Sequence, residues 1–400
     1  MRGNRTQCRV MKRCLVKCLM VFSAVSLLPF ALIYLISTDQ INRIKNYDFG
    51  NDTTVQSSDH PQSKPLTQNE LENIESRMMM RNLHLTERCT FFGLDQKGND
   101  SLHKPNSWEY LINKKHHLVW CNVFKAASTS WMYNFNLMAG YPEQFLQKSQ
   151  MVPLSLARKK YPRPSVKELN EALNISTSFL ITRHPFERLL SAYRDKLQYA
   201  LPHTFHQKLG NMIVRKFRKP VSYERGDNTH HPLMNNAHSY LQAKAKKVGT
   251  RWPTFSEFVE FLLFEAAHDA DLDMHWQPIT NFCTPCQVHF DLILKFETLD
   301  EDQRYLIEKA SLTGIIKPEH RNSGKGKNTN EILMSFYAQL TKSQVKGLYN
   351  VFRHDFELFD YSPDEFIKIA REDEENGVNS VNAQPRIELN IDRSKLLPFS

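Results

Sequence analysis

Two segments of this 400-residue chain place basic and hydroxyl-bearing side chains directly after apolar strands, and both could bind phosphate or sulfate. The first is residues 125–131 (KAASTSW), where a turn of small residues opens a predicted helix. Such a turn offers backbone N–H groups and the positive end of a helix dipole to an anion. Lys125 adds a mobile charge, and residues 128–130 add hydroxyl donors. The consensus of nucleotide-hydrolase P-loops is absent, and ordinary helix caps are the simpler alternative.

The second segment is residues 183–193 (RHPFERLLSAY), and it also follows an apolar strand. Arg183 stands at the carboxyl end of that strand, where ligands gather in open α/β sheets. An arginine there suits two-point contact with phosphate. Ser191 lies two helical turns further on, so it shares this groove only if the loop folds back. The alternative is an ordinary capped helix with Arg188 and Arg194 in solvent.

The elements that position these segments alternate between strand and helix. Strands are predicted at 117–124, 178–182 and 291–296, followed by helices at 129–138, 185–197 and 301–310. This order favours an α/β fold with a central parallel sheet and crossover helices. Apolar spacing predicts further helices at 67–82, 254–266 and within 331–359.

The formal net charge of +9 is concentrated at the N-terminus. Six basic residues and no acidic ones precede position 37, which leaves +3 for the rest of the chain. The composition is otherwise ordinary, with 41% hydrophobic and 24% charged residues. It excludes wholesale disorder, a collagen-like fibre and a membrane protein with many spans.

Residues 19–36 carry no charge and are long enough to span a bilayer. We expect an uncleaved signal-anchor at 15–36 rather than a cleaved signal peptide, because the run is long and lacks a small-residue cleavage site. The basic residues before it place 1–14 in the cytosol. Beyond it we expect a stem at 37–75, a catalytic domain at 76–368 and a loose tail at 369–400. Sequons predict lumenal glycosylation at Asn51, Asn99 and Asn174.

Four cysteines follow the predicted anchor: Cys89, Cys121, Cys283 and Cys286. An even number in an oxidising compartment favours structural disulfides. The spacing of Cys283 and Cys286 also fits half a zinc site, but no second pair completes it. The pairing stays open, and Cys121, in an apolar strand, could remain a free thiol.

Together the two anion-binding segments resemble the sulfonate-donor signature of sulfotransferases. Further segments are similar to the Golgi carbohydrate sulfotransferases that act on chondroitin, dermatan and related glycans, above all the chondroitin 4-O-sulfotransferase group. These segments are 213–219 (IVRKFRK), 273–276 (DMHW), 283–286 (CTPC), 290–300 (FDLILKFETLD) and 348–362 (LYNVFRHDFELFDYS). The resemblance covers roughly residues 75–365. It implies a sulfotransferase fold with a P-loop-like strand–loop–helix.

The resemblance implies that 3′-phosphoadenosine 5′-phosphosulfate is the donor. We expect no metal, because the leaving group is already a stabilised phosphate. The first segment would hold the phosphosulfate and the second the 3′-phosphate. The implied donor-binding residues are Phe124, Lys125, Ala126, Ala127, Ser128, Thr129, Ser130, Arg183, His184, Pro185, Phe186, Glu187, Arg188, Leu189, Leu190 and Ser191. The chain departs from the group at Phe124, where proline is usual, and at 126–128. These departures leave the acceptor more open than the donor.

For the reaction we assign Lys125 to the sulfonate and the leaving oxygen. His275 is assigned as the base that accepts the sugar hydroxyl proton. His184 and Glu187 are the rival bases, and a purely structural His275 is the alternative.

A basic cluster could hold a polyanionic acceptor, although charge runs are usually solvated faces. It comprises Arg215, Lys216, Arg218 and Lys219, with Arg225, Lys244, Lys246 and Lys247 nearby. The basic loop 321–327 either closes over the donor or is an exposed linker.

The expected protein is a type II Golgi enzyme that sulfates a glycosaminoglycan, most simply position 4 of N-acetylgalactosamine in chondroitin or dermatan. The alternatives are sulfation of another N- or O-linked glycan, a non-catalytic glycan-binding protein on this fold, and a kinase or NTPase. No nucleic-acid partner is expected.

Overall fold

The computed structural model describes residues 65–218, 251–316 and 329–373. The chain divides into two compact units, Met1–Pro65 and Leu66–Ser400, and the described elements belong to the second. Within the described ranges no helix is long and apolar enough to cross a bilayer. The predicted anchor, Asn51, Lys219, the 321–327 loop and most of the predicted tail lie outside these ranges.

A four-stranded sheet in the order β1-β2-β3-β4 forms the centre of the described unit. The strands are β1 (Tyr110–Asn113), β2 (Leu118–Cys121), β3 (Thr177–Thr182) and β4 (Leu292–Lys295). β2, β3 and β4 are parallel, with Trp120 opposite Phe179 and Leu180 opposite Ile293. β1 adds an antiparallel edge that the sequence reading did not anticipate. The α/β fold with a central parallel sheet is confirmed, and the complete sheet is mixed.

Helices follow the strands as expected and continue into a helical C-terminal part. They are α2 (Gln68–Phe91), α3 (Ser128–Met138), α4 (Glu143–Lys148), α5 (Pro153–Lys160), α6 (Val166–Leu173), α7 (Pro185–Tyr193), the π-helix η1 (Arg194–Gln198), α8 (Phe205–Phe217), α10 (Phe255–Ala267), α11 (Ile279–Cys283), the 3-10 helix η2 (Phe296–Thr298), α12 (Leu299–Lys309), α13 (Thr329–Tyr337), α14 (Lys342–Val351), α15 (Arg353–Leu358) and α16 (Asp364–Ile369).

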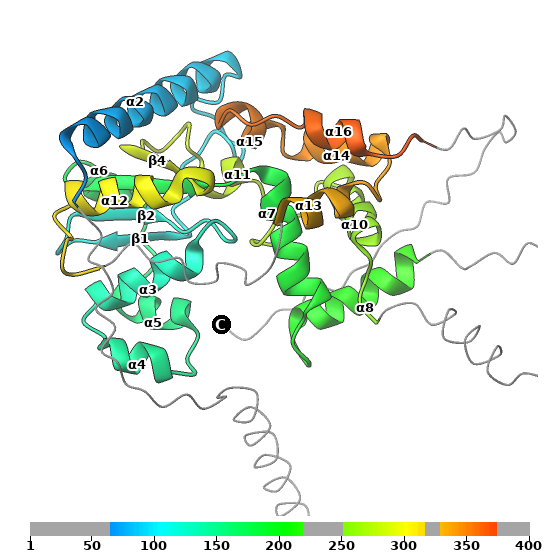
Figure 1. Ribbon diagram of the computed structural model, residues 1–400, viewed down its shortest axis with the longest axis horizontal. Coiled ribbons are helices and arrows are strands. Elements are labelled where there is room, and N and C mark those ends of the chain that lie inside the picture. The colour runs from blue at the N-terminus through cyan, green and yellow to red at the C-terminus, as the bar shows by residue number, and fades with distance from the viewer. Residues whose placement is uncertain (1–64, 219–250, 317–328, 374–400) are drawn as a thin grey trace, which may run out of the picture. The chain divides into compact units, whose positions relative to one another are not determined.

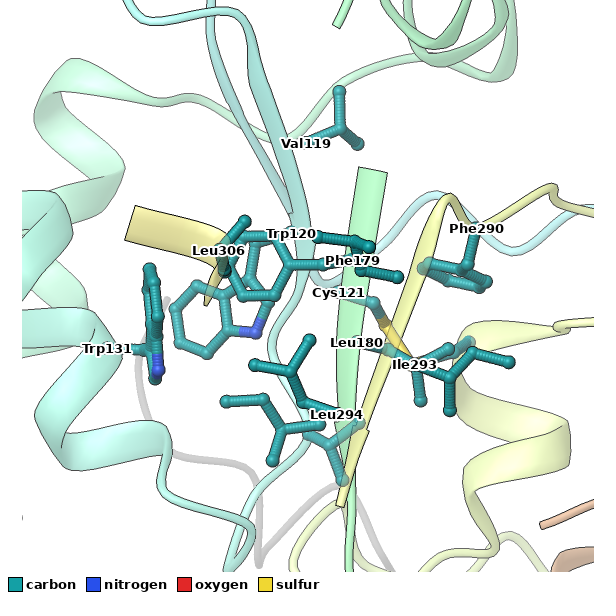
Figure 2. Close-up of a cluster of buried hydrophobic side chains, with 14 of the residues drawn as sticks. Val119, Trp120, Cys121, Trp131, Phe179, Leu180, Phe290, Ile293, Leu294 and Leu306 are labelled. Carbon is teal, nitrogen blue, oxygen red and sulfur yellow. A yellow bond between two sulfur atoms is a disulfide. The ribbon is translucent and has the colours of Figure 1, made fainter. Parts of the chain in front are cut away.

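Figure 1 shows α2 and α12 on one face of the sheet and α3 and α5 on the other. The strands are buried on both faces, so their apolar runs lack alternation. In the core the Trp120 ring stacks on Phe179 at 6.1 Å between centroids, and Trp131 of α3 lies 4.7 Å from Phe179 (Figure 2). A second apolar cluster joins α7, α8 and α10 to the C-terminal helices.

Two disulfides join distant parts of the chain. Cys121 at the end of β2 bonds to Cys283 at the end of α11 (Figure 2), and Cys89 of α2 bonds to Cys286. The prediction of structural disulfides is confirmed, and the alternative of a free Cys121 thiol is wrong. The first bond fixes α11 beside the carboxyl end of β2.

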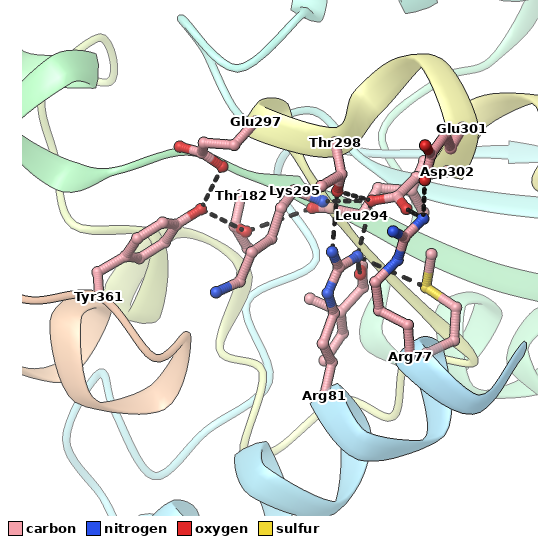
Figure 3. A network of polar contacts seen from close by, with 12 residues as sticks. Arg77, Arg81, Thr182, Leu294, Lys295, Glu297, Thr298, Glu301, Asp302 and Tyr361 are labelled. Carbon is pink, nitrogen blue, oxygen red and sulfur yellow. Dashed lines mark hydrogen bonds and ion pairs between the residues drawn. The ribbon is translucent and has the colours of Figure 1, made fainter. Parts of the chain in front are cut away.

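A buried carboxylate fixes α2 to the sheet (Figure 3). Asp302 of α12 has no exposed surface and accepts hydrogen bonds from Arg77 and Arg81 of α2, at 2.8 and 2.7 Å. Arg81 also donates to the carbonyl oxygen of Ile293 in β4. A buried charge is costly unless it is paired and hydrogen-bonded, and here both conditions are met. α2 therefore packs against the sheet of the second unit, and its first residues, from Gln68, fall within the range predicted as stem.

Candidate active site

The loop that joins β2 to α3 has a strained backbone. Lys125 and Ala127 both have positive φ, at 67° and 56°. For residues other than glycine this costs on the order of 1–2 kcal/mol each. Ala127 is the N-cap of α3 and makes no side-chain cap hydrogen bond. The first turn of α3 therefore presents N–H groups that a side-chain cap does not satisfy, as an anion-binding loop requires.

Lys125 is largely buried and its ammonium contacts Asp195 of η1, with Nζ 3.1 Å from Oδ2. Burial lowers the pKa of Lys125, and the Asp195 charge opposes that shift only in part. Asp195 also lies 3.2 Å from Nζ of Lys196. Asp195 lies in the π-helix η1, and π-helical segments are rare and frequent at functional sites. Lys125 thus has a carboxylate partner in Asp195.

Arg183 follows β3 and lies against the same loop. Its Nη1 donates to the carbonyl oxygen of Lys125 at 3.3 Å, and Nη2 donates to Glu187 at 3.1 Å. The guanidinium also stacks over the Phe296 ring, 4.2 Å from its centroid. The two segments predicted to bind the donor therefore meet at the carboxyl edge of the sheet.

Ser191 reaches this region without any folding back of the loop. It lies on α7 one turn after Glu187 and one turn before Asp195, so one helix face carries all three side chains. Glu187 pairs with Arg183, and Asp195 pairs with Lys125. Ser191 is partly exposed between them.

Other predicted donor-binding residues of this segment face inward. Phe186, Leu189 and Leu190 are buried in the second apolar cluster, where they position α7 rather than offer side chains to a ligand. Arg188 is also buried, so the solvent-exposed alternative is wrong for it. It donates to the carbonyl oxygens of Phe124, His275 and Gln277. Burial lowers the pKa of Arg188 to about 10, with Asp355 opposing the shift.

Contacts of Phe124 and Arg188 place His275 next to the loop that joins β2 to α3. The Phe124 ring lies 4.9 Å from the His275 ring, and Arg188 links the two backbones. Nδ1 of His275 lies 2.6 Å from Oδ1 of Asp273, and the other Asp273 oxygen lies 3.2 Å from Nε2 of His206 in α8. Nε2 of His275 has no hydrogen bond within the described residues.

The pKa shifts in this cluster follow from burial and pairing. Burial lowers the pKa of His275, although the hydrogen bond and charge of Asp273 act to raise it. Burial acts to raise the pKa of Asp273, but the hydrogen bonds from His206 and His275 outweigh it and hold that pKa below its usual range. The lowered pKa of His275 favours its neutral form, and Asp273 fixes one of its two ring nitrogens, which suits a general base.

The two rival bases are already occupied. The Nδ1 atom of His184 accepts the N–H of Phe186, and its Nε2 lies 3.1 Å from the carbonyl oxygen of Ser362. Glu187 is paired with Arg183. Among the three candidates, the geometry favours His275.

The same cluster bears on the expectation that no metal is needed. In the described ranges, His206, Asp273 and His275 are the only set of three or more His, Cys, Asp or Glu residues whose potential ligand atoms all lie within 4.8 Å of one another. Hydrogen bonds account for this spacing without an ion. A metal-free site stays a prediction.

The predicted acceptor cluster is only partly available. Arg215 and Lys216 are exposed near the end of α8. Arg218 donates to both carboxylate oxygens of Glu257, at 2.7 and 3.0 Å, so its charge is neutralised. The predicted glycosylation residues Asn99 and Asn174 are exposed, as modification would require.

Two functional candidates were missed at the sequence level. Asp195 comes two residues after the second anion-binding segment, but nothing in the neighbouring sequence signals a contact with Lys125. His206 lies 67 positions from Asp273 and carries no local signal. Both depend on tertiary contacts.

Residues 108–362 match a family model described as "Sulfotransferase family". The chain is 28% identical over 309 residues to carbohydrate sulfotransferase 11 of Mus musculus, covering 75% of this chain and 80% of that protein. It is 25% identical over 308 residues to carbohydrate sulfotransferase 9 of Homo sapiens, covering 76% and 64%. For carbohydrate sulfotransferase 12 of Xenopus laevis the identity is 27% over 316 residues, covering 72% and 70%. No solved structure matches.

Proposed function

This chain belongs to the sulfotransferase family, and we propose that it moves sulfonate from 3′-phosphoadenosine 5′-phosphosulfate to a hydroxyl of a glycosaminoglycan. Its relatives are named as carbohydrate sulfotransferases, which makes it a carbohydrate O-sulfotransferase. We propose position 4 of N-acetylgalactosamine in chondroitin or dermatan as the target, because the chain resembles the chondroitin 4-O-sulfotransferase group.

The observation that carries the proposal is the meeting of Lys125, Arg183 and His275 at one edge of the sheet. Arg183 donates to the backbone of Lys125, and Arg188 joins the backbone of Phe124 to that of His275. The hydrogen bonds of Arg183 and Arg188 thus hold the two cations, Lys125 and Arg183, close to the base, His275. The geometry fits transfer between two substrates better than simple glycan binding.

In the proposed reaction the sugar oxygen attacks sulfur in line with the leaving phosphate oxygen. The bond from sulfur to the sugar oxygen forms as the bond to the phosphate oxygen breaks. The hydroxyl proton moves to Nε2 of His275, and Asp273 holds the opposite nitrogen. Lys125 and the α3 N-terminus stabilise the charge that develops on the leaving oxygen and the sulfonate.

We also propose a Golgi membrane location with the catalytic domain in the lumen. The apolar N-terminal segment, preceded only by basic charge, supports this topology. The two disulfides support an oxidising compartment. The test is protease protection of tagged full-length chain in intact Golgi vesicles.

The activity is tested with the full-length chain in detergent, radiolabelled sulfonate donor and desulfated chondroitin, dermatan and heparan. We expect label on the first two glycans, loss of transfer in Lys125→Ala, and unchanged transfer with a chelator. Glycan binding without transfer would favour a non-catalytic protein, and labelling only from ATP would favour a kinase. A label confined to N- or O-linked glycans would move the acceptor to the alternative class.

A further inference from the structure

An exposed aromatic and a cation form a second feature at the edge of the sheet that carries Lys125. Trp108 lies two residues before β1, and β1 is antiparallel to β2, so its start lies beside the end of β2. The Trp108 side chain is 55% exposed. Arg163 covers part of its ring, with the guanidinium carbon 4.1 Å from the centroid. An exposed indole ring with a cation over one face offers both an apolar surface and a positive charge to a ligand.

A buried carboxylate holds this pair in place. Glu109 is 1% exposed and accepts hydrogen bonds from Arg158 at 2.9 Å and from Arg163 at 3.2 Å. Two cations on one carboxylate leave a net positive charge. Arg158 is well buried, whereas Arg163 is 41% exposed, so that charge reaches solvent through Arg163. The arginine fork is therefore pre-organised, which reduces the entropy lost on binding an anion.

Hydrogen bonds and ring contacts connect the Trp108 and Arg163 pair to the reaction centre, meaning the region around Lys125, Arg183 and His275. The carbonyl oxygen of Glu109 accepts the N–H of Asn122, two residues before Phe124. Asn106 donates to the carbonyl oxygen of Phe282 at 3.0 Å, and the Phe282 ring lies 6.0 Å from the Phe124 ring. Phe124 in turn packs against His275. These contacts thus connect Trp108, Glu109 and Arg163 to the loop that carries Lys125.

Trp108 and Arg163 also keep hydrogen-bond donors that do not contact other described residues. Arg163 has five N–H donors, and Glu109 is its only hydrogen-bond partner within the described residues. The indole N–H of Trp108 makes no hydrogen bond in the same part of the chain. Lys159 and Lys160 are exposed at the end of α5, close in sequence to Arg163. By contrast, the predicted acceptor residue Arg218 is occupied by Glu257.

We propose that Trp108 and Arg163 form an acceptor subsite that binds an anionic sugar next to the one that receives sulfonate. The indole ring stacks on the apolar face of the sugar, and Arg163 binds its carboxylate or sulfate. This subsite rests on the proposed function, because it assigns the recognition of a polyanionic glycan to this reaction centre. It lies beside β1, away from the α8 cluster predicted at the sequence level.

The test compares Trp108→Ala and Arg163→Ala with a matched control, Phe91→Ala. Phe91 is also an exposed ring, 70% accessible, under an arginine, since Arg88 lies 4.6 Å from its centroid. Kinetics are measured with long desulfated chondroitin and with a short oligosaccharide that ends at the sulfonated residue. The expected result is an acceptor KM raised on the order of tenfold for the long chain in both variants, which corresponds to about 1.4 kcal/mol. The donor KM and kcat stay unchanged, and the short acceptor shows no difference.

Several outcomes would overturn the subsite while leaving the enzyme's function intact. These are an unchanged acceptor KM, an equal loss with the short oligosaccharide, or the same loss in Phe91→Ala. If Trp108→Ala unfolds, Trp108→Phe keeps the ring and should retain most of the affinity, and a tenfold loss there also counts against the subsite. A wild-type protein that transfers no sulfonate to any glycan overturns the proposed function instead.

Discussion

At the scale of single residues, the least expected contact is the ion pair between Lys125 and Asp195. An anionic donor must compete with Asp195 for the ammonium of Lys125. The Lys125 side chain is 20% exposed and the Asp195 side chain is 49% exposed. Asp195 therefore acts to raise the pKa of the partly buried Lys125, which favours the charged ammonium, and it opposes donor binding by its own charge. The pair sets a balance between these two effects.

We predict that Asp195→Asn strengthens donor binding. Removing the carboxylate frees Lys125 and removes a negative charge from the anion site, so the donor KM should fall about twofold to fivefold. Steady-state kinetics with varied donor measure this, with Glu171→Gln as the control because Glu171 pairs with Lys167 on the surface of α6. An unchanged or higher donor KM would contradict this role.

We predict that Asp273→Asn changes the pH profile in a defined direction. The base works when His275 is neutral, so activity rises with pH through its pKa. Burial holds that pKa below its ordinary value of about 6.5, and Asp273 raises it. Loss of the carboxylate therefore moves the acid limb to lower pH, while kcat falls by up to about a hundredfold because Nδ1 is no longer held.

The control for this change is Asp271→Asn, an exposed carboxylate two residues earlier. In this control, both the maximal activity and the pH at which activity rises should stay unchanged. An acid limb that moves to higher pH in Asp273→Asn, or does not move, would show that His275 is not the titrating base.

At the scale of elements, α7 does more than carry donor-binding groups. Glu187 and Ser191 lie one turn apart on this helix, and Arg188 beside them is buried and donates to the carbonyl oxygen of Phe124 at the start of the loop. Because Arg188 donates to carbonyl oxygens of residues 124, 275 and 277, it connects segments about 150 positions apart. A single helix thus aligns the donor side of the centre with the base.

We predict that Arg188→Met is strongly destabilising. It leaves three carbonyl oxygens without this donor and leaves buried Asp355 without its cation, a loss of about 3 kcal/mol in the free energy of unfolding. Urea unfolding measures it, and Arg194→Met, on a partly exposed position of η1, should cost less than about 1 kcal/mol. If Arg188→Met lowered the free energy of unfolding by less than about 1 kcal/mol, the carbonyl oxygens would have found other partners.

The elements that sequence could predict were those with a strong local signal. The strands at 178–182 and 291–296 are continuous apolar runs, and Thr67 with Glu70 forms the expected capping box of α2. β1 is too short for a periodic signal, and it forms because β2 offers a free edge. The pattern at 331–359 predicted helix but not the breaks between α13, α14 and α15. The meeting of Lys125 with Arg183 followed from topology, whereas His206 and Asp195 depend on tertiary packing alone.

At the scale of the whole molecule, two disulfides of similar span have different positions. Cys121–Cys283 closes 162 positions beside the reaction centre, and Cys89–Cys286 closes 197 positions and ties α2 to the segment after α11. In the chain-entropy picture their contributions to stability are nearly equal, because the dependence on loop length is logarithmic. Their contributions to activity should differ.

We predict that replacing either pair by alanine costs about 5 kcal/mol or less of unfolding free energy, by similar amounts. Below the melting temperature, loss of Cys89–Cys286 should leave kcat within about twofold. Loss of Cys121–Cys283 should lower kcat further, since α11 and the His275 segment lose their covalent link to β2. Melting curves and kinetics of the two double variants test this; equal kcat values would show that packing alone holds the centre.

The nested arrangement of these bonds also constrains how the protein is made. During synthesis Cys89 and Cys121 leave the ribosome first, and neither is the other's partner. Their partners emerge more than 160 residues later, within a few residues of each other. An early oxidant would therefore trap a non-native bond between the first two thiols. The yield of active enzyme should accordingly depend on a disulfide isomerase in the producing cell rather than on oxidising power alone.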